Sequence, residues 1–200
     1  MNRIFNSLFY RIHRYFARLS APVMVYGYKR VDGLFLKNTR ISTSTIIVSP
    51  EHLILEDHVF IGHYNFIEAS GSVSIQEGAQ ISNFVSITTH SMHNAIRLYG
   101  KNFRNIKDKQ ILEKGSISIG AYTFIGPHSV ISPKTTIGKG SIVSAYSHVT
   151  GTFPDFSIIA GNPAKVVGST QKIDEAFLNW NPEYKYTYYN QEFVEHDKPV

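Results

Sequence analysis

An aliphatic side chain recurs at every sixth position over much of the second half of the chain. The positions that make this series are Ile119, Ile125, Ile131, Ile137, Val143 and Val149. The residue after each is small, and the fifth residue of each hexad is also small until Phe153 ends the pattern. Neither the 3.6-residue period of an α-helix nor the two-residue alternation of a half-buried strand produces this spacing.

The same spacing occurs earlier in the chain, with interruptions. Leu55, Ile61 and Ile67 form one block, and Ile75, Ile81 and Ile87 follow it two residues out of phase; a fainter series precedes them at Ile41, Ile47 and Leu53. These shifts of phase predict turns that are lengthened by a residue or two within one continuous fold.

A period of six predicts a short strand and a tight turn, with one aliphatic side chain pointing inward on each flat side. Three such sides close one coil of a triangular prism, and successive coils stack through parallel strand pairing. Small residues at the corners let the chain bend where a bulky side chain would clash with the neighbouring coil. We therefore predict an all-β solenoid over residues 40–168.

The remaining segments interrupt or flank this solenoid. Residues 1–39 are predicted to form an N-terminal helix and a lead-in, and residues 88–116 an excursion loop between two blocks of the repeat. Residues 169–200 break the repeat and hold an aromatic cluster of Trp180, Tyr184, Tyr186, Tyr188, Tyr189 and Phe193. Such a cluster can stack on sugar rings, but we favour a helical or irregular cap over the open end of the solenoid.

The first twenty residues have the pattern of an amphipathic helix. Arg3, Arg11, Arg14 and Arg18 are interleaved with apolar residues, and no uninterrupted apolar run reaches the length of a signal or membrane-spanning segment. One interpretation is a helix that lies on an anionic membrane surface. The other, which we favour, is a helix that packs against the body of the protein or a neighbouring subunit.

Composition and charge narrow the chemistry only slightly. The 200 residues contain 42% hydrophobic residues, enough to bury a core, and the formal net charge is +5. This balance suits anionic partners without requiring nucleic acid, and we expect no nucleic-acid partner. Because the chain has no cysteine, it has no disulfide framework, thiolate metal site or cysteine nucleophile.

The run of residues 117–168, and above all its ending at residues 160–166 (AGNPAKV), closely resembles the hexapeptide-repeat acyltransferases. Within this family the chain is most similar to the O-acetyltransferases that act on sugars and polysaccharides. The resemblance implies a left-handed parallel β-helix, assembled as a homotrimer with active sites between subunits. It also implies acetyl-CoA as the acyl donor and no metal cofactor.

The excursion begins with a histidine-rich segment, and long loops in regular solenoids usually carry function. Transfer of an acyl group to an alcohol needs a base, and a neutral imidazole can take the proton of the hydroxyl. Relatives carry their catalytic histidine in this context, so His90 is our candidate general base. His93 is the competing candidate, and we place His93 and Asn94 near the acceptor. The alternative is that His90 is an ordinary residue of a polar loop with no catalytic role.

Further roles are carried over from the resemblance. Glu68, after Ile67, stands where relatives have an acidic residue that can orient the base, although it could equally be a solvated turn residue. Pro127 and Ala145 match positions that contact the pantetheine arm of the coenzyme. Thr150, Gly151 and Lys165 match positions that contact its nucleotide end, and Phe124 matches an aromatic residue that lines the site. Phe124 replaces a tryptophan of many relatives and Gly151 a lysine, so an indole donor and one phosphate contact are lost.

We therefore predict an O-acetyltransferase that modifies a carbohydrate hydroxyl, on a sugar, a nucleotide sugar or a surface polysaccharide. N-acetylation of an amino sugar is the near alternative. A zinc hydratase on the same prism would use His58 and His63, but no histidine lies between His13 and His52 to supply the third ligand. A prism without catalytic activity is a further alternative. We expect the protein in the cytoplasm, or at the inner face of the membrane if the N-terminal helix binds lipid.

Overall fold

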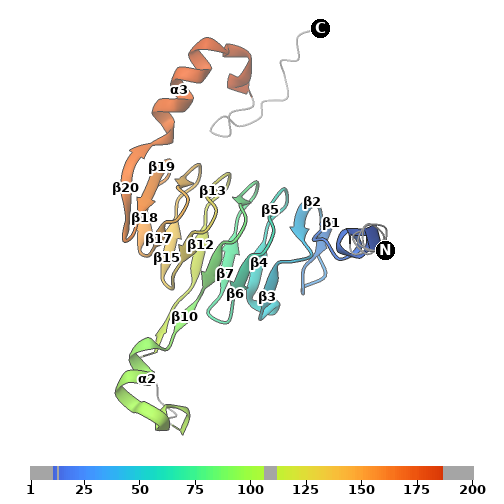
Figure 1. The fold of residues 1–200 in the computed structure, drawn as a ribbon. Coiled ribbons are helices and arrows are strands. Elements are labelled where there is room, and N and C mark those ends of the chain that lie inside the picture. The colour runs from blue at the N-terminus through green and yellow to red at the C-terminus, as the bar shows by residue number, and fades with distance from the viewer. Residues whose placement is uncertain (1–10, 13, 106–111, 187–200) are drawn as a thin grey trace, which may run out of the picture.

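The computed structural model describes residues 11–12, 14–105 and 112–186 of the chain. In these ranges the backbone winds into stacked coils (Figure 1). Three sheets form the sides of the resulting prism, and their strands are parallel except for one antiparallel pair at each end of the largest sheet. This architecture confirms the predicted all-β solenoid.

The three sides are named here faces A, B and C, and each is one sheet. Face A contains β1 (Met24–Lys29), β2 (Phe35–Ser42), β5 (Phe60–Ile61), β8 (Gln80–Ile81), β13 (Phe124–Ile125), β16 (Ile142–Val143), β19 (Ser157–Gly161) and β20 (Ala164–Ser169). Face B contains β3 (Ile46–Val48), β6 (Phe66–Glu68), β9 (Ser86–Thr88), β14 (Val130–Ile131) and β17 (His148–Val149). Face C contains β4 (Leu53–Leu55), β7 (Val73–Ile75), β12 (Ile117–Ile119), β15 (Thr135–Ile137) and β18 (Thr152–Phe153).

The corners form three edges, named after the faces that they join. The AB edge comprises residues 43–45, 62–65, 82–85, 126–129 and 144–147. The BC edge comprises residues 49–52, 69–72, 89–116, 132–134 and 150–151, and includes the short 3₁₀ helix η1 (Pro50–His52). The CA edge comprises residues 56–59, 76–79, 120–123, 138–141 and 154–156.

The strand register explains the shifts of phase in the sequence. In the early coils, successive pairs such as Ile61 and Ile81 are twenty residues apart, whereas Ile125 and Val143 are separated by eighteen. The two extra residues lie at the BC edge, where Leu55 rather than Leu53 continues the inward series. Lengthened turns are thus confirmed as the cause.

The prism is filled by its aliphatic series, and its corners are held by hydroxyl groups. From Leu55 onward the inward Ile, Val and Leu side chains are fully or almost fully buried, whereas Ile41 and Ile47 in the first coil are partly buried. The small polar residues at the corners are buried as well, and their hydroxyls donate to backbone carbonyls; Thr123 bonds Gly138 at 3.0 Å and Ser129 bonds Ser144 at 3.0 Å. Small size is therefore only part of the requirement at these positions, because each also satisfies a backbone acceptor inside the coil.

The described residues of the excursion, 88–105 and 112–116, form a projecting arm with secondary structure of its own. A two-stranded antiparallel stalk of β10 (His90–Ser91) and β11 (Glu113–Lys114) leads into α2 (His93–Tyr99) and the 3₁₀ helix η2 (Gly100–Asn105). Figure 1 shows this arm pointing away from the prism. The hexad pattern carries no signal for the helix, since the arm does not take part in coil stacking.

The N-terminal side of the solenoid opens with β1 and β2, an antiparallel pair whose second strand joins face A through Arg40 and Ile41. Residues 14–19 are helical, and every described residue of 11–20 is exposed. Packing of this helix against the body of the protein is therefore wrong for the described residues, because an exposed helix buries no apolar face. Packing against a neighbouring subunit, the other half of that interpretation, stays a prediction. Residues 1–10 and 13 lie outside the described part.

The last coil is closed by β20, which pairs antiparallel with β19 and covers the edge of face A. Thr170, at the start of α3 (Thr170–Trp180), is buried and donates its hydroxyl to the carbonyl of Gly140 at 2.8 Å. The rest of α3 and the 3₁₀ helix η3 (Pro182–Tyr186) run away from the prism (Figure 1). Trp180 is 87% exposed, so the prediction that it packs over the open end is wrong. Residues 187–200 are not described.

The inward series predicts a clear contrast between two substitutions of the same kind. Ile131→Ala removes a fully buried side chain from β14 and should lower the free energy of unfolding by about 2 to 5 kcal/mol, because the packed interior cannot close the cavity. Ile54→Ala removes an exposed, outward side chain from β4 and should change it by less than about 1 kcal/mol. Urea unfolding of both variants measures the difference, and equal effects would contradict the inward assignment.

Candidate active site

His90 lies on the BC edge, where the chain leaves the prism. It is the first residue of β10 and pairs with Lys114 across the stalk. The preceding strand β9 is paired in register with β6, so that Thr88 lies beside Glu68 on the coil below. Coil stacking thus brings the end of β6 under the first residues of the excursion.

Glu68 contacts His90 directly. Its Oε2 atom lies 2.8 Å from Nδ1 of His90, and its side chain is only 8% exposed, against 30% for the imidazole. The sequence allowed two roles for Glu68, a carboxylate that orients the base or a solvated turn residue. A buried carboxylate in contact with the histidine has the geometry of the first alternative.

Further donors surround the carboxylate of Glu68. The backbone N–H of Ser70 donates to Oε1 at 2.9 Å, and the hydroxyl of Thr89 donates to Oε2 at 2.7 Å. Thr89 in turn accepts a hydrogen bond of 2.7 Å from the N–H of Gly71. Because this N–H occupies the acceptor side of the hydroxyl, the hydroxyl proton of Thr89 is directed toward Glu68.

These contacts determine the charge of the carboxyl group. Burial would raise the pKa of Glu68, but hydrogen bonds from the side chain of Ser70, from Thr89, from the backbone of Ser70 and from His90 lower it to about 2. At neutral pH the group is therefore a carboxylate, which only accepts hydrogen bonds.

The charge of Glu68 in turn fixes the tautomer of the histidine. Nδ1 of His90 must carry the proton that it donates to Glu68, so in the neutral ring Nε2 has the free lone pair. Ser70 Oγ lies 3.4 Å from Nδ1, which is too long for a strong competing bond. Among the described residues Nε2 has no hydrogen-bond partner, and it can accept a proton from a bound molecule.

Sequence reasoning missed Thr89 and Ser70 as parts of this site. A signal was present, because the twenty-residue spacing from Ile67 to Ile87 aligns Ser70 with His90. Thr89 carries no such signal. Its contact with Glu68 depends on where the chain turns out of β9, and that turn lies outside the repeat.

The candidate coenzyme residues fall on two different edges. Pro127 and Ala145 are neighbours on the AB edge, where the N–H of Tyr146 donates to the carbonyl of Pro127 at 3.0 Å. The coils approach so closely here that a Cβ atom on Gly126 would lie 2.6 Å from the backbone nitrogen of Ala145. The structure thus brings these two residues together.

The other candidates are spread over the last coils. Thr150 and Gly151 form the BC corner after β17, on the same edge as His90, and Gly151 has a positive φ of 103°. Phe124 points outward from face A, in register with Ile142, and Lys165 is an exposed residue of β20. The two groups on the edges are separated by the width of face B.

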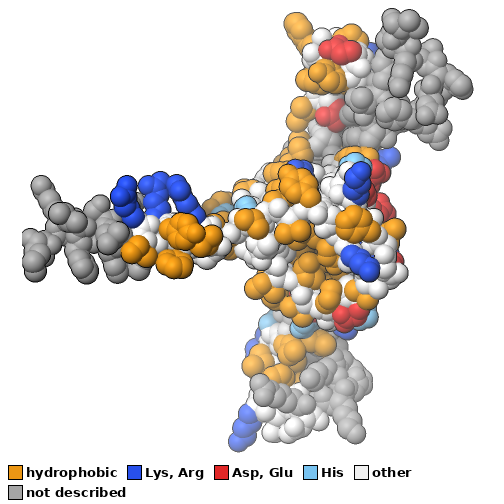
Figure 2. Space-filling model, turned by 90° about the vertical axis from the view of Figure 1, so that its right-hand side faces the viewer, with side chains coloured by type: hydrophobic (Ala, Val, Ile, Leu, Met, Phe, Trp, Pro, Cys, Tyr) orange, Lys and Arg blue, Asp and Glu red, His pale blue; other side chains and the backbone are white. Residues whose placement is uncertain are grey.

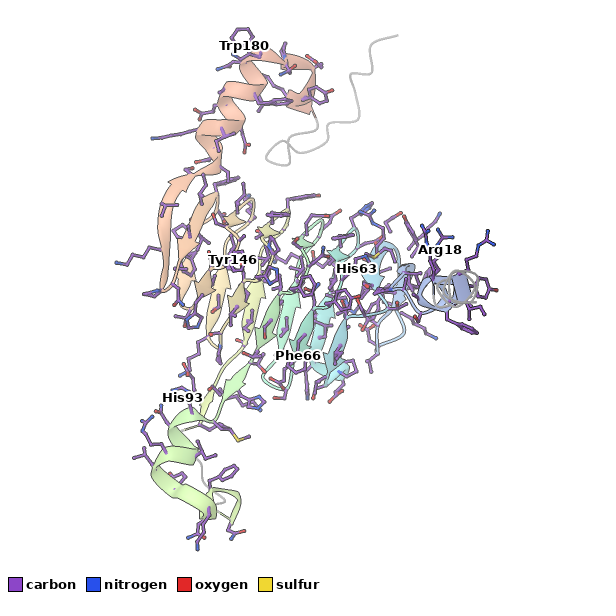
Figure 3. All side chains as sticks on the ribbon, viewed as in Figure 1. Arg18, His63, Phe66, His93, Tyr146 and Trp180 are labelled. Carbon is purple, nitrogen blue, oxygen red and sulfur yellow. The ribbon has the colours of Figure 1, made fainter. Side chains whose placement is uncertain are left out.

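His93 and Asn94 begin α2, just beyond the stalk. Nδ1 of His93 lies 2.7 Å from Ser91 Oγ and 4.0 Å from Oε2 of Glu113, and the Asn94 side chain accepts from Arg97 at 2.7 Å. Figure 3 shows His93 at the root of the projecting arm. Both residues are therefore held by their own arm rather than by the Glu68 network.

The histidines considered for zinc do not meet. His58 lies on the CA edge beside the Asn38 side chain, whereas His63 lies on the AB edge, 2.7 Å from Ser42 Oγ. They flank β5 at its opposite ends. Among the residues that the structure describes, no three His, Asp or Glu side chains form a group that could hold a metal ion.

The lowered pKa of Glu68 predicts a pH-dependent contribution to stability. The folded chain favours the ionised form, so this contribution is present above the ordinary pKa of 4.5 and is lost as the pH falls toward about 2. Between pH 6 and pH 3 the free energy of unfolding of the wild-type chain should therefore fall by about 2 kcal/mol more than that of the Glu68→Gln variant.

Urea unfolding of wild type and Glu68→Gln at several pH values measures this difference. Glu51→Gln, at an exposed carboxylate on the same edge, is the matched control and should parallel the wild type. If the difference in free energy of unfolding between wild type and Glu68→Gln were the same at every pH in this range, the proposed hydrogen-bond network would be contradicted.

Comparisons with known proteins agree with the fold and the repeat. A family model described as "Bacterial transferase hexapeptide (six repeats)" matches residues 116–151. A protein of Escherichia coli K12, WbbJ, whose name assigns it to O-acetyl transfer in lipopolysaccharide biosynthesis, is 32% identical over 116 residues, which cover 58% of this chain and 59% of that protein. A Staphylococcus aureus protein named as an acetyltransferase is 47% identical over 60 residues, covering 30% of this chain and 29% of its own.

A solved structure extends the likeness over more of the chain. AntD, an N-acyltransferase from Bacillus cereus in complex with dTDP and 3-hydroxybutyryl-CoA, has a TM-score of 0.53 at 21% identity, over 74% of this chain and 89% of its own. This likeness concerns the fold. Over residues 116–151 the chain carries the bacterial transferase hexapeptide repeat, and its fold is the left-handed parallel β-helix.

Proposed function

We propose that the protein transfers an acetyl group from acetyl-CoA to a hydroxyl of a carbohydrate, with His90 as the general base. The observation that carries this proposal is the pair of His90 and Glu68, in which an ionised, buried carboxylate holds one nitrogen of an accessible imidazole. This pairing prepares the other nitrogen, Nε2, to accept a proton. A residue that only decorated a polar loop would not need such a buried partner.

The proposed reaction needs one proton to move twice. Nε2 of His90 removes the proton of the acceptor hydroxyl as its oxygen attacks the carbonyl carbon of the thioester. The imidazolium that forms is stabilised by the carboxylate of Glu68 at Nδ1, 2.8 Å away. As the carbon–sulfur bond breaks, Nε2 returns the proton to the departing thiolate, so that free coenzyme A and the acetyl ester leave a neutral histidine.

The relatives support the donor and the class of acceptor. The name of the E. coli relative refers to O-acetyl transfer in lipopolysaccharide biosynthesis, and the B. cereus structure holds an acyl-CoA together with dTDP. By analogy we infer a sugar, a nucleotide sugar or a surface polysaccharide as acceptor of this chain. A coenzyme A donor also fits the cytoplasmic location that we expect.

We assign the coenzyme to the two edges that flank face B. Pro127 and Ala145 would follow the pantetheine arm along the AB edge, and Thr150, Gly151 and Lys165 would meet the nucleotide end. Lys165 can pair with a phosphate as a point charge. The exposed ring of Phe124 offers an apolar wall, while His93 and Asn94 at the root of the excursion would face the acceptor.

We further infer a homotrimer with the active site between two subunits. Within one chain, His90 and the Pro127–Ala145 pair lie on different edges, with face B between them. The BC edge of one copy placed against the AB edge of the next would bring base and coenzyme together. Outward apolar residues support a contact here, because they lie on faces A and B (Phe66, Phe124, Val130 and Ile142), whereas face C is mostly Ser and Thr.

Replacement of the base tests the reaction. His90→Ala should lower turnover by about 10² to 10⁴, the usual contribution of general base catalysis, without loss of the fold. Release of free thiol from acetyl-CoA, measured with a panel of sugars, nucleotide sugars, amino sugars and oligosaccharides, reports the rate and separates O-transfer from N-transfer.

Two other histidines provide the comparison for this variant. His52→Ala, on the same edge but away from the Glu68 network, should leave the rate unchanged. His93→Ala should weaken acceptor binding more than turnover. Unchanged turnover in His90→Ala together with a large loss of turnover in His93→Ala would transfer the role of the base to His93.

Complementation between two inactive variants tests the site between subunits. His90→Ala removes the base, and Ala145→Trp fills the proposed coenzyme groove from the AB edge. When the two variants are unfolded, mixed in equal amounts and refolded, about a quarter of the sites in a random trimer combine two intact edges, and activity should return to that level. Mixtures as inactive as the separate variants would mean that each chain completes its own site.

A further inference from the structure

The N-terminal segment of residues 11–20, called here the N-terminal arm, stands apart from the prism. Figure 2 shows it extending from the body, with Lys and Arg side chains on one side and hydrophobic side chains on the other. We propose that this arm binds the surface of an anionic lipid bilayer. The proposal does not depend on the acetyl transfer described above.

The apolar side of the arm has no partner within the described chain. Ile12, Tyr15, Phe16 and Leu19 recur at helical spacing, and each is between 46% and 66% exposed. Among the described residues their one ring contact lies within the arm, where Tyr15 and Phe16 are edge to face with centroids 5.9 Å apart. A row of large apolar side chains left in water indicates a surface that another phase or molecule covers.

The basic side of the arm identifies the kind of surface. Arg11, Arg14 and Arg18 follow the same helical spacing on a different side of the helix. An apolar stripe flanked by arginines is the pattern of helices that lie in the interfacial plane of anionic bilayers, where the apolar residues enter the acyl boundary and the arginines meet phosphates. Nucleic acid would satisfy the arginines alone and would leave the apolar row in water.

The distribution of charge extends this argument beyond the arm. Residues 1–40 hold eight Lys and Arg and one Asp, a net charge of +7, whereas residues 41–200 hold twelve Lys and Arg and fourteen Asp and Glu, a net charge of −2. The modest charge of the whole chain therefore conceals a strongly basic N-terminal fifth. Such a dipolar distribution attracts one end of the protein to an anionic surface and leaves the rest free.

The β1–β2 pair next to the arm offers additional apolar contact. The exposed large residues of this pair and of the turn that connects its strands are Val25, Tyr26, Val31, Leu34 and Phe35. Among the described residues no helix has both the length and the apolar character needed to cross a bilayer. Contact through a surface helix is the form of attachment that these residues support.

Sedimentation of the full chain with lipid vesicles tests the proposal. We expect binding to phosphatidylcholine vesicles that contain phosphatidylglycerol, weaker binding at high salt, and little binding to phosphatidylcholine alone. The triple variant Arg11→Gln, Arg14→Gln, Arg18→Gln should bind on the order of 10²-fold more weakly, since each basic residue at such a surface contributes about 1 kcal/mol. Phe16→Ser with Leu19→Ser should also weaken binding.

The matched control removes three exposed lysines outside the N-terminal fifth, in Lys134→Gln, Lys172→Gln, Lys185→Gln, and should bind as the wild type does. Equal losses in the two triple variants, equal binding to both kinds of vesicle, or no binding would overturn the proposal. A change in subunit number by light scattering in Phe16→Ser, Leu19→Ser, without vesicle binding by the wild type, would instead assign the arm to a second copy. Thiol release with soluble acceptors should be unchanged in all these variants.

Discussion

The stacking of one inward aliphatic side chain on the next is the interaction on which the structure depends. Every flat side contributes one such residue per coil, and almost all are fully buried. A polar or missing side chain in this series would open a cavity that the neighbouring coils cannot fill, because their backbones are already in contact. The corners are limited by the same requirement, because each corner must place the next inward side chain directly over that of the neighbouring coil.

This constraint acts unequally on the three edges. Across the AB edge and the CA edge, successive inward residues are always six apart, as in Ile61 to Ile67 and Ile75 to Ile81. Across the BC edge the separation changes from coil to coil: eight, eight, thirty-two, six and four residues from Ile47 to Phe153. Variation in coil length is thus confined to one edge, and His90 lies there.

The aromatic residues of the AB edge follow from the spacing of the coils. Tyr64, Phe84, His128 and Tyr146 stack face to face with centroids 4.8 to 5.1 Å apart, close to the separation of neighbouring strands. All four have positive φ near 60°, a conformation that costs a residue with a side chain about 1 to 2 kcal/mol. Stacking of about 0.5 to 1.5 kcal/mol per pair offsets much of this cost. Figure 3 places Tyr146 and His63 along this side of the prism.

The sequence predicted those features that repeat. The inward series, the parallel coils and the start of the excursion follow from a period that is visible in the residues themselves. The projecting helices could not be predicted in the same way, because Trp180 and the N-terminal arm take no part in coil stacking. An aromatic or amphipathic segment shows that it has an apolar face without showing what that face contacts.

The candidate site illustrates the same limit at the scale of single atoms. His90 and Glu68 could be predicted because each stands next to the repeat. Their contact could not, because it depends on the number of residues that the coil has at the BC edge. Since corners carry no inward side chain, residues can be added there at little cost to the core, and loop closure penalises length only weakly. The BC edge, which tolerates insertion, therefore supplies the excursion that would meet an acceptor. It also supplies the added corner residues Ser70 and Gly71, which help to hold the carboxylate of Glu68 in place. A rigid prism with a single variable edge can thus change the surroundings of its histidine without changing its core.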